Sequence, residues 1–169
     1  MTRVAVGTIS AGFIATIALV AVPAYLSRTR REKTTEATIN LRLLFEAASA
    51  YYERERRGPD GARTRACIVD PAATPNIPGV DNQTLSASEM PRSFVALGFA
   101  PPDPLYYRYE IISTQSRCNQ QPGLPIYTFR ARGDLDGDGI QSTFELAVGV
   151  SERNELFRAP GFYIFNELE

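Results

Sequence analysis

The N-terminal stretch from Val4 to Val22 contains nineteen consecutive residues without a charged side chain, and Pro23 follows it. At about 1.5 Å of rise per residue, a helix of this length approaches the roughly 30 Å hydrocarbon thickness of a bilayer. A cleaved signal usually has an apolar core of only about 7–15 residues. The stretch therefore predicts an uncleaved, membrane-spanning N-terminal helix. We expect Pro23 to kink this helix, because proline removes a backbone hydrogen bond.

A basic segment follows the apolar stretch. Its positive side chains are Arg28, Arg30, Arg31 and Lys33. Basic residues beside a membrane span contact anionic lipid head groups or stay solvated, and we expect contact with inner-membrane lipid here.

The remainder of the chain predicts one globular domain. From Thr34 to Arg57 the apolar residues recur at the spacing of one helical face, while Glu36 and Asn40 fall on the opposite face, which we expect to meet water. Downstream, a short helix is expected at 91–99. Alternating or aromatic-rich runs predict strands at 105–113, 126–132, 142–150 and 162–165.

The expected fold class is therefore α+β. A long N-terminal membrane-spanning helix would pack its amphipathic C-terminal half on a small antiparallel β-sheet. Residues 1–33 would form the membrane-spanning helix and basic turn, and residues 34–169 the globular domain.

The charge distribution argues against several functions. Residues 1–66 carry 11 basic and 6 acidic side chains, whereas residues 67–169 carry 7 and 13, so nucleic acid is not an expected partner of the acidic domain. The chain has no histidine, which removes the commonest general base and the usual catalytic triads. We therefore do not expect an enzyme.

The two cysteines, Cys67 and Cys118, fit one disulfide in an exported domain, although two unrelated buried thiols are the alternative. In the chain-entropy model, closing this loop adds about 3–4.5 kcal/mol to the free energy of unfolding. The basic residues after the apolar stretch instead favour a cytoplasmic domain by the positive-inside rule. A basic leader ahead of Met1 would resolve this conflict.

Several motifs in chain order resemble the type IV pilins and the type II secretion pseudopilins. These motifs are the apolar N-terminal stretch with Pro23-Ala24-Tyr25-Leu26, then Thr35-Glu36-Ala37, Asn40-Leu41-Arg42, Tyr51-Tyr52, Leu97-Gly98-Phe99, Tyr106-Tyr107-Arg108-Tyr109 and the run 133–139. The resemblance implies export through the inner membrane and packing of the long helices into a filament core. Val6 stands where these pilins carry a glutamate, so a divergent or minor member is expected.

The segment from Asp134 to Glu145 matches the twelve-residue calcium-loop pattern. It places acids at positions one, three, five and twelve and Gly139 at position six. The predicted calcium ligands are Asp134, Asp136, Asp138, the carbonyl of Ile140, Ser142 and Glu145. Asp-Gly pairs also suit a tight hairpin turn between strands, and the two interpretations are compatible.

Two functional hypotheses follow. The first is a structural subunit of a pilus or pseudopilus filament, assembled with identical or pilin-like subunits through the N-terminal helix. It would reside in the inner membrane before assembly and in a surface, extracellular or periplasmic filament afterwards. The second is a membrane-tethered envelope binding domain, with or without a response to calcium, that does not polymerise.

Overall fold

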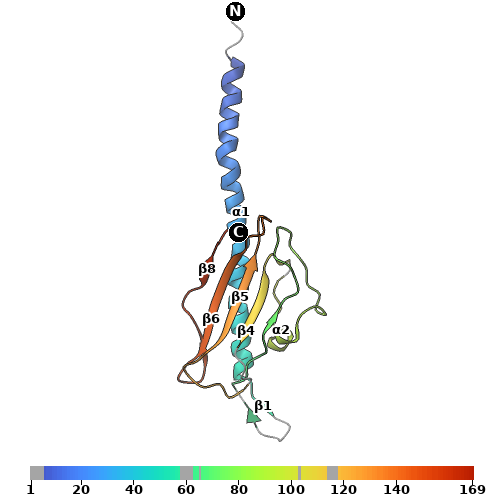
Figure 1. Cartoon of the computed structure of the whole chain (residues 1–169), viewed down its shortest axis with the longest axis vertical. Helices are drawn as coiled ribbons and strands as arrows, with labels where there is room; N and C mark the ends of the chain where they lie inside the picture. The colour runs from blue at the N-terminus through green and yellow to red at the C-terminus, as the bar shows by residue number, and fades with distance from the viewer. Residues whose placement is uncertain (1–5, 58–62, 65, 103, 114–117) are drawn as a thin grey trace, which may run out of the picture.

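One long helix runs through the molecule, and a β-sheet covers part of its length (Figure 1). The computed structural model describes the backbone of residues 6–57, 63–64, 66–102, 104–113 and 118–169; it describes side chains at 25, 28–55, 66–102, 104–113 and 118–169. Helix α1, Val6–Glu53, has 48 residues, which corresponds to about 72 Å. Its C-terminal half lies against the sheet, and its N-terminal half extends beyond the globular part (Figure 1).

The sheet contains six antiparallel strands in the order β3-β4-β5-β6-β7, with β8 also paired to β6. The strands are β3 Ala72–Ala73, β4 Arg108–Ser113, β5 Pro125–Gly133, β6 Ser142–Val150, β7 Leu156–Arg158 and β8 Tyr163–Phe165. A separate two-stranded hairpin joins β1, Arg56–Arg57, to β2, Arg63–Thr64. The second helix, α2, spans Arg92–Leu97.

The expected fold class was wrong as stated. Within the part of the chain that the structure describes, no helix is long and apolar enough to cross a membrane. Apart from Tyr25, the side chains described on α1 begin with the mostly charged run 28–33, and the buried apolar residues farther on occupy only one stripe. The sheet is also larger than the small one expected, because the short strands β3 and β7 extend it.

The apolar stripe of α1 packs on the inner face of the sheet. Its members are fully or almost fully buried at helical spacing: Ala37, Leu41, Leu44, Ala48 and Tyr52. Opposite them, alternate residues of the three central strands are buried, such as Tyr109, Phe129 and Leu146. This alternation leaves the polar residues of the same strands on the outer face.

Gly133 permits close packing at the end of β5. A β-carbon at this position would lie 2.5 Å from the ring of Tyr107, so a larger residue would displace a fully buried aromatic side chain. That ring in turn packs edge-on against Phe144, with ring centroids 5.8 Å apart.

The predicted disulfide between Cys67 and Cys118 is confirmed. The neighbouring segment is held to both the helix and the sheet: the Ala66 amide donates to the carbonyl of Tyr52 at 3.1 Å, and the Val69 amide donates to the hydroxyl of Tyr127 at 2.8 Å. The disulfide joins this segment, which follows β2, to the segment before β5.

We predict that Cys67→Ser lowers the free energy of unfolding by about 4 kcal/mol, because the disulfide closes a loop between residues 51 positions apart. Denaturant titration with and without reductant measures the effect. Reductant should destabilise the parent to the level of the variant and leave the variant unchanged. Equal stability of the oxidised parent and the variant would show that the bond does not stabilise the fold.

Candidate functional site

The acidic loop between β5 and β6 is built by its own hydrogen bonds. The carboxylate of Asp134 accepts the amides of Gly137 at 2.8 Å and Gly139 at 3.2 Å, and Asp138 accepts the amide of Ile140 at 2.7 Å. Gly137 and Gly139 have φ angles of 76° and 90°, a region that glycine adopts without steric cost. The Asp and Gly residues of the sequence pattern thus form a tight connection between two strands.

Three carboxylates converge in this loop. Oxygen atoms of Asp134, Asp136 and Asp138 all lie within 4.8 Å of one another, with Asp134 buried and the other two exposed. Such a group could hold a metal ion, and carboxylate oxygens suit a hard cation.

The other predicted calcium ligands are not members of this carboxylate cluster. Glu145 is on β6, where its carboxylate accepts a 2.6 Å hydrogen bond from Arg130. It is three residues into an extended strand that begins at Ser142, so the backbone carries it about 10 Å from the strand's start. The hydroxyl of Ser142 donates to the carbonyl of Gly133 at 3.3 Å, and Ile140 is an exposed loop residue. The sequence pattern therefore identified the aspartates that come together, whereas the structure does not bring Glu145 to them.

An arginine of helix α1, Arg30, contacts the acidic loop. Arg30 forms an ion pair with Asp136 at 3.2 Å and donates to the carbonyl of Leu168 at 3.4 Å. At the chain's end, partial burial and the negative charges of Asp136 and Asp138 raise the pKa of Glu169, while Arg30 opposes this shift. Sequence reasoning missed both Arg30 and Glu169 as neighbours of the loop, because no short-range pattern links residues so far apart in the chain.

The remaining basic residues after the apolar stretch differ in their surroundings. Lys33 lies 4.1 Å from the ring centroid of Tyr106, a cation–π contact, and is 3.5 Å from the carbonyl of Val80. Arg28 forms an exposed ion pair with Glu32, and Arg31 is exposed. Lipid contact by these residues stays a prediction. The side chain of Pro23 lies outside the described side chains, and α1 is assigned as one helix through this residue, so the kink is also untested.

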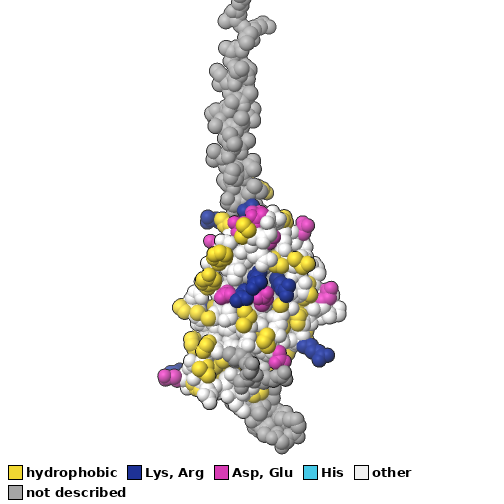
Figure 2. Space-filling view, in the orientation of Figure 1, with side chains coloured by type: hydrophobic (Ala, Val, Ile, Leu, Met, Phe, Trp, Pro, Cys, Tyr) yellow, Lys and Arg dark blue, Asp and Glu magenta, His cyan; other side chains and the backbone are white. Residues whose placement is uncertain are grey.

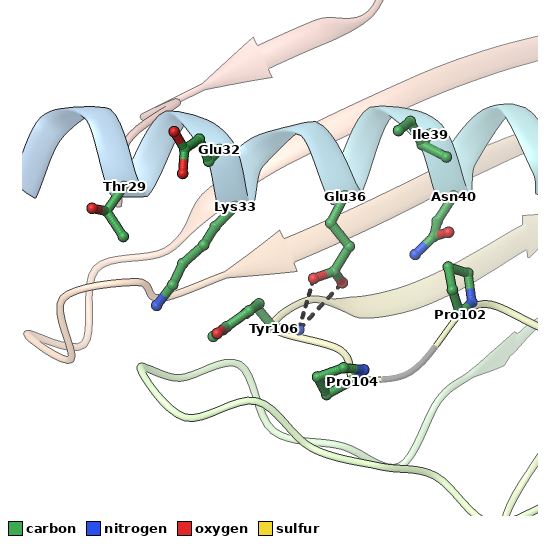
Figure 3. A pocket seen from close by; sticks show the side chains of 9 residues that line it. All are labelled: Thr29, Glu32, Lys33, Glu36, Ile39, Asn40, Pro102, Pro104 and Tyr106. Atoms are coloured by element: carbon green, nitrogen blue, oxygen red, sulfur yellow. Dashed lines mark hydrogen bonds between the residues drawn. The ribbon is translucent and has the colours of Figure 1, made fainter.

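A groove runs between α1 and the segment before β4 (Figure 3). It has a volume of about 500 Å³ and is lined by Thr29, Glu32, Lys33, Glu36, Ile39, Asn40, Pro102, Pro104 and Tyr106. Glu36 reaches across to the backbone that leads into β4, as Figure 3 shows.

Glu36 is the main polar link between α1 and the sheet. Its carboxylate accepts the amides of Tyr106 at 3.0 Å and Tyr107 at 3.3 Å, and the hydroxyl of Tyr109 at 2.8 Å. Asn40 donates to the same hydroxyl at 2.9 Å. Burial raises the pKa of Glu36, although these hydrogen bonds act in the opposite direction.

The expectation that Glu36 and Asn40 face water was therefore wrong. Asn40 is buried and Glu36 is half-buried, because the segment before β4 covers this side of α1. At 100° per residue, Glu36 and Asn40 lie on the flank of the apolar stripe, and helical periodicity carries no information on a polar partner that arrives from another part of the chain.

Comparison of the chain with protein-family models, with curated proteins and with solved structures finds no match.

We predict that Glu36→Gln changes the pH dependence of stability. Because the pKa of Glu36 is raised from 4.5 on folding, its contribution to the free energy of unfolding is fully present below that value and is lost as pH rises through the folded pKa. The parent should therefore lose stability relative to the variant as pH rises from about 4.5. Denaturant titrations at several pH values measure this difference.

Glu46→Gln, at an exposed position of the same helix, is the matched control. A constant stability difference between the parent and Glu36→Gln across pH 4–8 would contradict a raised pKa.

Proposed function

We propose that this chain is a structural subunit of a filament, similar in design to type IV pilins and type II secretion pseudopilins. The observation that carries the proposal is the shape of α1. One continuous helix of 48 residues forms the core of the globular part with its C-terminal half and extends beyond it with its N-terminal half (Figure 1). A helix that extends beyond its own domain can pack against the helices of other subunits.

The sequence of the extending half supports helix–helix assembly. Between Val4 and Val22 every residue is uncharged, and small residues recur at Gly7, Ala11, Gly12, Ala15 and Ala18. Small residues let helix backbones approach closely. In this proposal the partners are further copies of the chain or similar subunits, whose helices bundle at the filament core while the sheets face outward.

The disulfide supports an extracytoplasmic location. Disulfides persist mainly in oxidising compartments, and Cys67 and Cys118 are joined in this structure. We therefore propose a filament at the cell surface or in the periplasm.

We predict that Ala15→Arg blocks incorporation into filaments, because a buried charge without a partner is costly in an apolar helix bundle. Electron microscopy of sheared surface material from cells carrying tagged full-length chain measures incorporation. Ala87→Arg, the same substitution at an exposed loop position, is the control and should leave labelled filaments unchanged. Equal labelling by the two variants would contradict assembly through this helix. A parent chain that never labels filaments and stays monomeric would favour the non-polymerising binding domain.

We also propose that the acidic loop binds calcium. Three aspartates within 4.8 Å repel one another, and calcium accepts six to eight oxygen ligands in flexible geometry. Asp134, Asp136 and Asp138 would bind the ion, with the Ile140 carbonyl and Ser142 as further candidates and Glu169 as an additional carboxylate nearby. Because Asp136 also pairs with Arg30 of α1, the ion would stabilise the loop at the point where the helix leaves the domain.

We predict that calcium raises the melting temperature of the full chain and that chelator reverses the effect. At 100 times its dissociation constant, calcium should add about 2.7 kcal/mol to the free energy of unfolding. Asp138→Asn should abolish the shift, and Asp81→Asn, an exposed acid outside the loop, should not. Isothermal titration calorimetry measures the binding directly.

Glu145→Gln separates this site from a complete twelve-residue calcium loop. Since Glu145 pairs with Arg130, the variant should keep its calcium affinity while losing stability with or without the ion. Loss of calcium binding in Glu145→Gln would show that the loop rearranges around the ion. The absence of heat and of a thermal shift up to millimolar calcium would leave only a hairpin turn.

A further inference from the structure

The outer face of the sheet, on the side away from α1, carries two rows of side chains in register across four strands. One row runs Glu110, Arg130, Glu145, Tyr163, and the next runs Arg108, Arg132, Thr143, Phe165. Residues directly opposite each other in an antiparallel sheet share a face and contact one another. Figure 2 shows Lys or Arg and Asp or Glu side chains grouped in the middle of this face, with apolar side chains around them.

In the first row, two carboxylates balance the positive charge of Arg130. The Arg130 guanidinium contacts Glu145 at 2.6 Å and Glu110 at 3.3 Å. Burial acts against the charged form of Arg130, but hydrogen bonding and attraction from the two carboxylates outweigh it and raise the pKa of its guanidinium. This arginine is therefore not available to another anion.

The second row has a surplus of positive charge. Arg108 and Arg132 are directly opposite each other, and each forms an ion pair with Glu110 at 3.8 Å, a distance too long for a hydrogen bond. Glu110 also pairs with Arg130, so its single negative charge is shared among three arginines. Their side chains are 38% and 39% exposed, and the buried Nε of Arg108 finds no hydrogen-bond acceptor among the described residues. Like charges in opposite cross-strand positions repel each other. Glu110 offsets only part of this repulsion, so a second anion at the exposed ends of the two guanidiniums would reduce it further and accept N–H donors that Glu110 leaves unused.

The same row continues with a hydroxyl and an aromatic ring. Thr143 is the cross-strand partner of Arg132, and Phe165, a residue that is 54% exposed, is the partner of Thr143 on β8. At about 4.8 Å between neighbouring strands, Phe165 lies about 10 Å from Arg132 along the row. An extended arginine side chain and a ligand that contains one ring can together span the distance from Arg132 to Phe165. The row thus presents a site for negative charge at one end and a flat apolar surface at the other.

We propose that this row, Arg108, Arg132, Thr143 and Phe165, binds a small ligand in which one carboxylate or phosphate is attached to a flat ring. The anion lies between the two guanidiniums, which present planar, paired donors suited to both oxyanions. The ring stacks on Phe165, and Thr143 offers a hydroxyl to polar substituents between them. The site is on the opposite side of the sheet from α1, so ligand binding and packing through the helix do not compete for the same surface.

The test compares ring-bearing and ringless anions on the full-length chain by NMR titration. Benzoate should bind roughly two- to tenfold more tightly than acetate, and phenyl phosphate more tightly than inorganic phosphate by a similar factor, because an aromatic contact contributes about 0.5–1.5 kcal/mol. The larger affinity of the two ring-bearing probes identifies the preferred oxyanion. Saturating shifts should centre on residues 108, 132, 143 and 165.

Three variants separate the contributions. Arg132→Gln should weaken all four anions at least threefold, and Phe165→Ala should remove only the advantage of the ring-bearing pair. Arg153→Gln removes the same charge at an exposed position outside the row. It should change neither the affinity for the four anions nor the advantage of the ring-bearing pair. If Arg132→Gln does not fold, Arg132→Lys tests the same point, because it keeps the charge and loses the planar fork.

Equal weakening by Arg132→Gln and Arg153→Gln would overturn the proposal, since it would reduce binding to non-specific attraction. Equal affinity of the parent for benzoate and acetate would also overturn it, because the aromatic end of the row would then have no role. Shifts that never saturate in the parent chain would do the same.

Discussion

The packing of the apolar stripe of α1 on the inner face of the sheet is the contact on which the rest of this structure depends. Five helical positions from Ala37 to Tyr52 are buried against alternate residues of the central strands. Without this contact the inner face of the sheet would expose its aromatic residues to water. The same contact brings Arg30 to the acidic loop and Glu36 to the backbone before β4. The helix is thus the core element of the domain, and it also positions Arg30 and Glu36.

The two faces of the sheet differ in the side chains that they carry. The inner face is apolar because it must cover α1, and the outer face carries the polar residues left by strand alternation. We propose that filament assembly uses the extending half of the helix, which leaves the outer face accessible to a ligand. The acidic loop lies at the end of the sheet where α1 leaves the domain, so an ion there would stiffen the link between the two parts.

The sequence predicted the elements whose signals are local. The alternation in 126–132 and 142–150 corresponds to β5 and β6, and the spacing of Leu41, Leu44 and Ala48 identified the buried stripe. The sequence did not predict the short strands β3 and β7. Two or three residues show no hydrophobic period, and such strands form only beside a longer strand. Glu145 was assigned to the metal site by spacing alone, but an extended strand carries it away from the loop. The burial of Glu36 and Asn40 depends on a distant segment, which no helical pattern reveals.

Hydrogen exchange of the full-length chain tests the central claim most directly, namely that the C-terminal half of α1 and the sheet form one cooperative unit. The amides of Leu44 and Ala48 should exchange with the same free energy of opening as those of Phe129 and Leu146, close to the free energy of global unfolding. Both groups should also respond equally to low concentrations of denaturant. Exchange of the helical amides through a much smaller opening, while the strands stay protected, would show that the sheet is stable without the helix and would contradict this account.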